Sequence, residues 1–207
     1  MSTHATTRRI AFAAVTVLIA VAIGVYALMS KPQPGQRSFG EALVGGPFTM
    51  VNQKGETVTE KSFAGKPMLL FFGYTYCPDV CPTELQVMAE ALRQLGDKAS
   101  DIQPILVSID PARDTPQVLA DYVTVFDPSF IGLHGSEEQV QQLMKQYGVT
   151  AVRKDLPGSA LGYTIDHTAF VHVIDQSGRW REQFPFGASA EDMAGDVRQL
   201  IRSGGRL

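Results

Sequence analysis

Two cysteines lie close together in the segment 73–82, which reads GYTYCPDVCP, and the chain contains no others. Three residues separate Cys77 from Cys81, so a helix that began near them would place both sulfurs on one face. A helix N-terminus lowers the pKa of nearby thiols because it carries partial positive charge and free N–H groups. Thiolates are both reactive nucleophiles and ligands of soft metal ions. The spacing therefore indicates either redox chemistry or a metal site.

Three interpretations of the cysteine pair stay open on spacing alone. A structural disulfide suits an oxidising compartment, but a bridge across three residues restrains little chain and so stabilises little. Thiol–disulfide exchange and a soft-metal site are equally favoured, and thiolates prefer copper(I), zinc or iron–sulfur. A structural zinc site needs two further ligands. Haem attachment needs a C-x-x-C-H motif, which the sequence lacks.

A third ligand has to come from elsewhere, and the histidines are the candidates. The chain has four, at positions 4, 134, 167 and 172. His4 precedes a segment without charges and is expected on the opposite side of a membrane from the cysteines. His134 follows a short predicted strand, where a surface loop residue explains it as well as a ligand does.

His167 and His172 are both placed at a strand predicted over residues 168–174. They have opposite parity along that strand, so only one of them readily points at the cysteines. His167 lies at the strand entrance, and its imidazole is a good borderline donor for copper. Asp166 or a backbone carbonyl would fix its tautomer.

Two acidic residues are expected to support the site without binding the metal. Asp79 lies between the cysteines, where the dipole of the predicted helix favours an acid, and it serves equally well as a docking contact for a partner. Asp110 ends the second long predicted strand and is expected to approach the edge of the site. Neither is a strong ligand for copper(I), which prefers softer donors. The following turn is predicted to cap a helix through Asp114 and Thr115.

Strands and helices alternate along most of the chain. Predicted strands cover residues 48–51, 57–59, 68–72, 102–109, 131–133, 168–174 and 180–184, and predicted helices cover 82–95, 116–126, 136–147 and 190–202. This order predicts a mixed α/β fold with a central sheet flanked by helices. Ligands of such sheets bind beyond the carboxyl ends of the strands, and the segment after residue 72 carries both cysteines.

The N-terminal segment predicts a membrane anchor. Residues 10–29 include no charged residue and are about as long as a helix that crosses ~30 Å of hydrocarbon. The segment is longer than the apolar core of a cleaved signal peptide, which is the alternative together with a twin-arginine signal. Arg8 and Arg9 would hold residues 1–9 in the cytoplasm and leave the rest of the chain outside. A bacterial plasma membrane fits this pattern best.

The remaining sequence predicts one domain on a tether. Residues 30–46 are rich in proline and glycine and read as a flexible tether, and the folded domain is expected over 47–207. Hydrophobic residues make up 44% of the chain and charged residues 19%, as in ordinary globular proteins. The net charge of −3 and the lack of a basic patch exclude nucleic acid as a partner.

Three segments resemble the Sco/SenC family, the copper-delivery proteins of cytochrome c oxidase assembly. They are GYTYCPDVCP at 73–82, SIDPARDTP at 108–116 and DHT at 166–168, and they occur in the family's order. The resemblance extends from about residue 47 to the C-terminus. It implies a thioredoxin-like fold with an added hairpin, and a copper ion bound by Cys77, Cys81 and His167.

The resemblance also implies a function, a location and partners. The favoured expectation is a non-enzymatic metallochaperone that loads the binuclear copper centre of cytochrome c oxidase subunit II. It would be a single-pass protein of the bacterial inner membrane with its domain in the periplasm. An upstream periplasmic copper chaperone or a thiol reductant would be a further partner. The alternatives are a thiol–disulfide oxidoreductase that uses Cys77 and Cys81 as its redox-active pair, and a peroxidase-like enzyme that would not need His167.

Overall fold

The structure is a computed structural model, and it describes residues 44–204. The predictions for residues 1–9, 10–29 and 30–43, which are the cytoplasmic N-terminus, the anchor and most of the tether, lie outside the described residues. Within residues 44–204, no helix is both long enough and apolar enough to cross a membrane.

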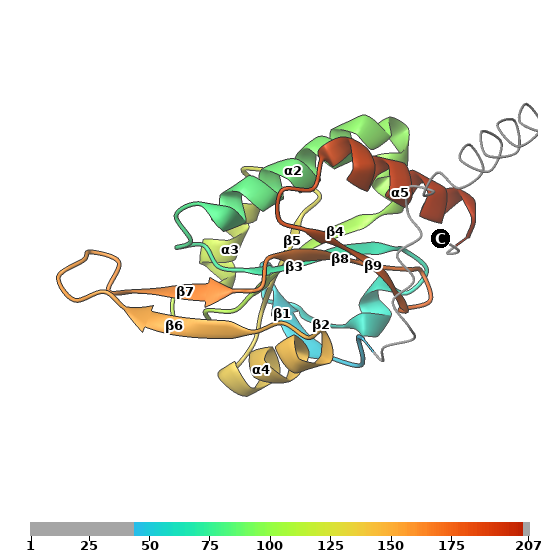
Figure 1. Ribbon diagram of the computed structural model, residues 1–207. Helices are drawn as coiled ribbons and strands as arrows, with labels where there is room; N and C mark the ends of the chain where they lie inside the picture. The colour runs from blue at the N-terminus through green and yellow to red at the C-terminus, as the bar shows by residue number, and fades with distance from the viewer. Residues whose placement is uncertain (1–43, 205–207) are drawn as a thin grey trace, which may run out of the picture. The chain divides into compact units, whose positions relative to one another are not determined.

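A seven-stranded sheet forms the centre of the described chain (Figure 1). Its strands, in spatial order, are β2 (Thr57–Thr59), β1 (Thr49–Asn52), β5 (Ile131–His134), β4 (Gln103–Ser108), β3 (Met68–Gly73), β8 (Phe170–Ile174) and β9 (Trp180–Pro185). β3, β4 and β5 are paired in parallel, whereas β1, β8 and β9 join by antiparallel pairing. The mixed α/β sheet agrees with the sequence prediction.

Helices cover both faces of this sheet. They are α2 (Val80–Leu95), α3 (Pro116–Val123), α4 (Glu137–Gln146) and α5 (Ala190–Arg202), with the short 3-10 helices η1 (Glu60–Phe63) and η2 (Gly96–Asp101). α2 and α5 pack against each other on one face, and α4 lies on the opposite face (Figure 1). All six residues of β3 are buried, which is why that strand reads as a continuous apolar run.

The helix ends follow the local signals in the sequence. Thr115 is the N-cap of α3 and accepts a hydrogen bond from the backbone N–H of Val118. Ser136 forms a capping box with Gln139 at the start of α4. Gly148, with φ of +66°, follows α4 in a conformation that favours glycine. These caps fix where the loops on either side of the sheet begin.

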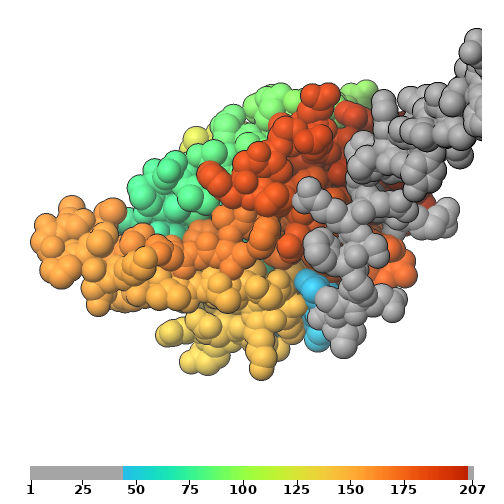
Figure 2. Space-filling view, viewed as in Figure 1, coloured from blue at the N-terminus to red at the C-terminus, as the bar shows by residue number. Residues whose placement is uncertain are grey.

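The strand pattern did not predict the second, two-stranded sheet, although the family resemblance implied an added hairpin without placing it. It is the antiparallel hairpin of β6 (Ala151–Asp155) and β7 (Tyr163–His167). The hairpin projects beyond the main sheet on the side where α2 begins (Figure 1), and it stands out from the body in the space-filling view (Figure 2). Most of its residues are exposed or half-buried. A strand without a buried face has no apolar alternation, so the sequence pattern gave no signal for it.

This second sheet corrects the expected relation between His167 and His172. The strand predicted over 168–174 begins only at Phe170, and His167 is the last residue of β7. The parity argument is therefore wrong, because the two histidines belong to different sheets. Its conclusion nevertheless holds, since His167 reaches the cysteines and His172 lies on the face covered by α4.

His172 is buried among aromatic side chains, with 1% of its surface exposed. Its ring centroid lies 5.4 Å from that of Tyr147 and 5.9 Å from that of Phe72. The indole N–H of Trp180 donates to Nδ1 at 3.3 Å, so the proton of the neutral ring is on Nε2. Nε2 has no hydrogen-bond partner within residues 44–204. Burial lowers the pKa of His172 to about 4.

His172 makes the stability of the fold dependent on pH. The ordinary pKa of histidine is 6.5, so between pH 6.5 and about 4 the unfolded chain takes up a proton that the folded chain does not. The free energy of unfolding therefore falls as the pH drops through this window, by up to about 1.4 kcal/mol per pH unit. We expect His172→Phe to flatten this dependence in urea denaturation of the full-length chain. His134→Asn is the control and should keep the wild-type slope, and an unchanged slope in His172→Phe would contradict the assignment.

Candidate metal centre

Both cysteines lie beyond the carboxyl end of β3, where the chain turns into α2. Cys81 is in the first turn of α2 and is fully buried, whereas Cys77 precedes the helix and is half-buried. Helical spacing alone therefore does not bring the sulfurs together. The loop does so by folding back, because the backbone N–H of Cys81 donates to the Cys77 Sγ at 3.3 Å. The N–H of Cys77 in turn donates to the carbonyl of Tyr74 at 3.3 Å.

Gly73 makes room for the buried sulfur at the end of β3. A Cβ atom at this position would lie 3.0 Å from the Cys81 Sγ and 2.8 Å from the ring of Phe71. Real Cβ atoms essentially never lie as close as 2.8 Å to a neighbour, and 3.0 Å is tighter than nearly all real Cβ contacts, so a side chain at this position would force the Phe71 ring to move and would crowd Cys81.

His167 reaches the cysteines from the second sheet. Its Nε2 lies 3.3 Å from the Cys81 Sγ, and the ligand atoms of Cys77, Cys81 and His167 all lie within 4.8 Å of one another. The ring Nδ1–H donates to the carbonyl of Thr168 at 3.1 Å, which fixes the tautomer and leaves the Nε2 lone pair free. Of the two tautomer partners expected from the sequence, the backbone carbonyl is the one used, and Asp166 pairs with Lys154 instead.

Aromatic rings enclose the imidazole of His167. The ring centroids of Phe71 and Tyr74 each lie 6.0 Å from it in edge-on arrangements. Tyr74 is itself buried, and its hydroxyl accepts from the backbone N–H of Ile165 at 3.0 Å and bonds to the Thr164 hydroxyl at 2.9 Å. Tyr74 thus links the cysteine loop directly to the strand that carries His167.

The two cysteines share one negative charge. The hydrogen bond from the Cys81 side chain, helped by backbone N–H groups, lowers the pKa of Cys77 to about 4 although burial opposes this. The same bond to the Cys77 thiolate, together with burial, raises the pKa of the Cys81 thiol above its ordinary value. The pair therefore holds a thiolate at the accessible position and a thiol at the buried one. Cys81 becomes a ligand only when a bound cation displaces its proton.

The two acids expected beside the site occupy different places. Asp79 is exposed and takes the N-cap position of α2, although its side chain caps no helix N–H. Asp110 is buried, and its hydrogen bonds come from Arg113 at 2.5 Å and from the Tyr163 hydroxyl at 2.7 Å. Asp110 therefore reaches the site through Arg113 and Tyr163, whose roles the sequence did not suggest.

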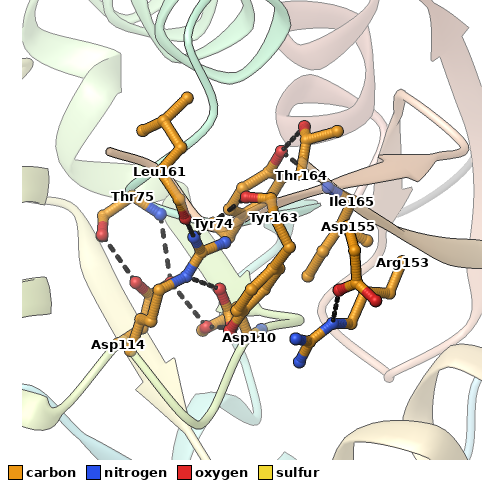
Figure 3. A network of polar contacts seen from close by, with 12 residues as sticks. Tyr74, Thr75, Asp110, Asp114, Arg153, Asp155, Leu161, Tyr163, Thr164 and Ile165 are labelled. Atoms are coloured by element: carbon orange, nitrogen blue, oxygen red, sulfur yellow. Dashed lines mark hydrogen bonds and ion pairs between the residues drawn. The ribbon is translucent and has the colours of Figure 1, made fainter. Parts of the chain in front are cut away.

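Asp114 is a further residue that the sequence analysis missed. It was expected to cap a helix, but Thr115 is the cap and Asp114 is fully buried. Its carboxylate accepts from the Thr75 N–H at 3.1 Å and the Thr75 hydroxyl at 2.6 Å (Figure 3). It also accepts from the Ser108 hydroxyl at 2.7 Å. Burial raises the pKa of Asp114. The Asp114 carboxylate therefore holds the loop after β3 in place. The sequence pattern around a buried aspartate that accepts hydrogen bonds from a loop looks the same as the pattern around an aspartate that caps a helix.

A groove of about 510 Å³ opens beside Cys77 and His167. Its apolar lining includes Phe186, which is 50% exposed, and Asp79 lies on its edge. The loop that carries Phe186 is held to α2 by Glu84, a buried carboxylate that accepts from the Gly187 N–H at 3.2 Å. A partner therefore has access to Cys77 and His167 through the groove, while Cys81 stays behind them.

The family model described as SCO1/SenC matches residues 36–202, which is most of the chain. The chain belongs to the SCO1/SenC family. An SCO2-like protein of Rickettsia prowazekii is 34% identical to it over 189 residues, which cover 86% of this chain and 92% of the relative.

Two solved structures with copper bound resemble this Sco protein. ScoI of Bradyrhizobium japonicum is 41% identical, with a TM-score of 0.69 over 75% of this chain and 98% of that one. ScoI of Arabidopsis thaliana is 32% identical, with a TM-score of 0.73 over 77% of this chain and 99% of that one. The described chain has the thioredoxin-like α/β fold of Sco proteins. These copper-bound structures and the cluster of Cys77, Cys81 and His167 support copper as the metal.

The shared charge predicts how the Sco thiols react. Because the pKa of Cys77 is about 4, its thiolate persists at mildly acidic pH. We expect the alkylation rate of Cys77 by iodoacetamide to be nearly constant from pH 8 to pH 5.5, measured by peptide mass spectrometry on the reduced full-length chain. Cys81→Ala removes the donor and should slow alkylation of Cys77 at pH 5.5. A wild-type rate that climbs roughly tenfold per unit across this range, as for an ordinary thiol, would contradict the assignment.

Proposed function

We propose that this Sco protein is a metallochaperone that carries copper on Cys77, Cys81 and His167 to the binuclear copper centre of cytochrome c oxidase subunit II. The observation that carries the proposal is the convergence of two sulfurs and one imidazole nitrogen within 4.8 Å. Thiolate and imidazole donors together suit copper, and the site has no hard carboxylate ligand among them. Copper bound to a relative that is 41% identical supports the same assignment.

The unequal burial of the ligands suits a carrier. Cys77 and His167 border the groove, so an incoming ligand of the partner meets them before it meets Cys81. Three protein ligands leave a position open for that incoming thiolate or imidazole. Release then proceeds by exchange of ligands one at a time, without unfolding of the domain.

The proposed location follows from the sequence before the described residues. Residues 10–29 would be a single transmembrane anchor in the bacterial inner membrane, with residues 1–9 in the cytoplasm and 30–46 as a tether. The copper-binding domain, 47–207, would then work in the periplasm. There an upstream copper chaperone would load it, or a thiol reductant would keep Cys77 and Cys81 reduced.

A thiol–disulfide oxidoreductase is the second candidate, and the low pKa of Cys77 favours it. The Cys77 thiolate would attack a disulfide of the partner and form a mixed disulfide, and Cys81 would then displace the partner. The partner leaves as a dithiol, reduced by two electrons, and the pair becomes a 77–81 disulfide. In this role the protein would keep the cysteines of the same copper centre reduced, and His167 would not be needed.

Copper affinity separates the two candidates. We expect the reduced full-length chain to bind one copper(I) ion in competition with a chromophoric chelator. Cys77→Ser should abolish tight binding, and His167→Ala should weaken it by at least the roughly tenfold to a hundredfold that is lost when a group orienting a ligand is removed, because here a ligand itself is lost. His134→Asn is the matched control, since His134 bonds to the Asp114 carbonyl and lies outside the ligand cluster.

Two outcomes would overturn the chaperone assignment. If His167→Ala bound copper as tightly as wild type, His167 would not be a copper ligand. Brisk reduction of a disulfide substrate by the copper-free chain, equally fast in His167→Ala and wild type, would favour the oxidoreductase.

A further inference from the structure

The place of His167 at the site depends on side-chain contacts. His167 ends β7, and β7 pairs only with β6 within the described residues. The cysteines follow β3 of the main sheet. His167 lies shortly before Phe170, the first residue of β8, and β8 pairs with β3, so the main chain of His167 is tied to the main sheet on that side. No strand pairing joins the rest of the hairpin to the main sheet within the described residues, so other groups must hold it there and so help to set the separation of imidazole and sulfurs.

The geometry points to Arg113 as a positioning residue that fixes this separation, an inference that rests on the proposed copper site. Arg113 lies between β4 and α3, and only 15% of its side chain is exposed. Its Nη1 donates to the carbonyl oxygens of Leu161 at 3.0 Å and Tyr163 at 3.1 Å. Its Nε donates to the buried carboxylate of Asp110 at 2.5 Å. One guanidinium therefore donates to two carbonyls of the hairpin backbone. Its own position is fixed by Asp110, which follows β4 of the main sheet.

The same guanidinium also contacts the cysteine loop. Its central carbon lies 3.6 Å from the ring centroid of Tyr163, on the hairpin, and 4.7 Å from that of Tyr76. Tyr76 immediately precedes Cys77. The hydroxyl of Tyr163 donates to Asp110 at 2.7 Å, which closes the network (Figure 3). Cation–π contacts of this kind are strongest where water is excluded, as it is around this side chain.

Arg113 and Tyr74 together hold the first three residues of β7. Arg113 bonds at the start of the strand, at Tyr163, and Tyr74 bonds at Thr164 and Ile165. With one anchor removed, β7 is less restrained and turns about the other anchor and about its link to β8, which moves the His167 imidazole relative to the cysteines. Lysine does not replace arginine here, because a single ammonium lacks the planar fork that bonds to two carbonyls and a carboxylate at once.

Arg113→Lys in the full-length chain tests this role, with Arg153→Lys as the control. Arg153 stacks on the same ring of Tyr163 at 3.7 Å, but its ion pair with Asp155 stays within the hairpin. In the metal-free protein, we expect Arg113→Lys to raise amide hydrogen exchange roughly tenfold at residues 161–167 while the main sheet is unchanged. After loading with copper(II), the imidazole nitrogen coupling in the electron paramagnetic resonance spectrum should be lost, and the thiolate-to-copper absorption should remain. Arg153→Lys should match wild type in both.

Each result decides for or against the positioning role. Wild-type exchange and wild-type nitrogen coupling in Arg113→Lys would overturn it, and so would faster exchange spread evenly over the whole chain. If wild type itself binds no copper, the proposed function fails, but hydrogen exchange in the metal-free chain still tests Arg113. Should Arg113→Lys not fold, Tyr76→Leu replaces it, because that ring is 48% exposed. Unchanged exchange at residues 161–167 in Tyr76→Leu would then overturn the inference.

Discussion

The site depends on one contact between two separate sheets, the 3.3 Å approach of the His167 imidazole to the buried Cys81 sulfur. The cysteines belong to the rigid centre of the fold, since they follow a strand whose residues are all buried. His167 belongs to a largely exposed hairpin. The main sheet therefore provides a fixed platform with two sulfurs, and the hairpin adds the third donor from outside. The side chains of Tyr74, Arg113 and Asp110 join the two parts.

The two cysteines differ in burial and in charge, and these differences give them different roles. Cys77 carries the charge and borders the groove, while Cys81 is sealed behind it and keeps its proton. An isolated charge in the position of Cys81 would be costly, because little water is there to solvate it. The arrangement keeps the empty site at a single negative charge. It also places the more reactive sulfur where a partner arrives.

Local sequence signals predicted the main sheet, its helices and their caps, because the strands there are either wholly buried or clearly alternating. The cluster of Cys77, Cys81 and His167 was also expected, although the spacing argument assumed a helix that begins near the cysteines and placed His167 at the entrance of the strand that contains His172. The strand pattern did not place the hairpin, because its residues bury no face. Asp114 and Arg113 were missed because a buried carboxylate and a capping one look alike in sequence, as do a stacked arginine and a solvated one. Such roles depend on what the fold brings near, which local pattern does not encode.

Gly73 has a consequence for recognising this kind of site in other chains. The buried sulfur occupies the space that a side chain at position 73 would need. A glycine four residues before the first cysteine is therefore as much a part of the motif as the cysteines themselves. A chain that keeps both cysteines but has a bulkier residue there would have to repack the Phe71 ring and the second sulfur around it. The difference between one open and one sealed sulfur thus depends on a residue that carries no donor atom of its own.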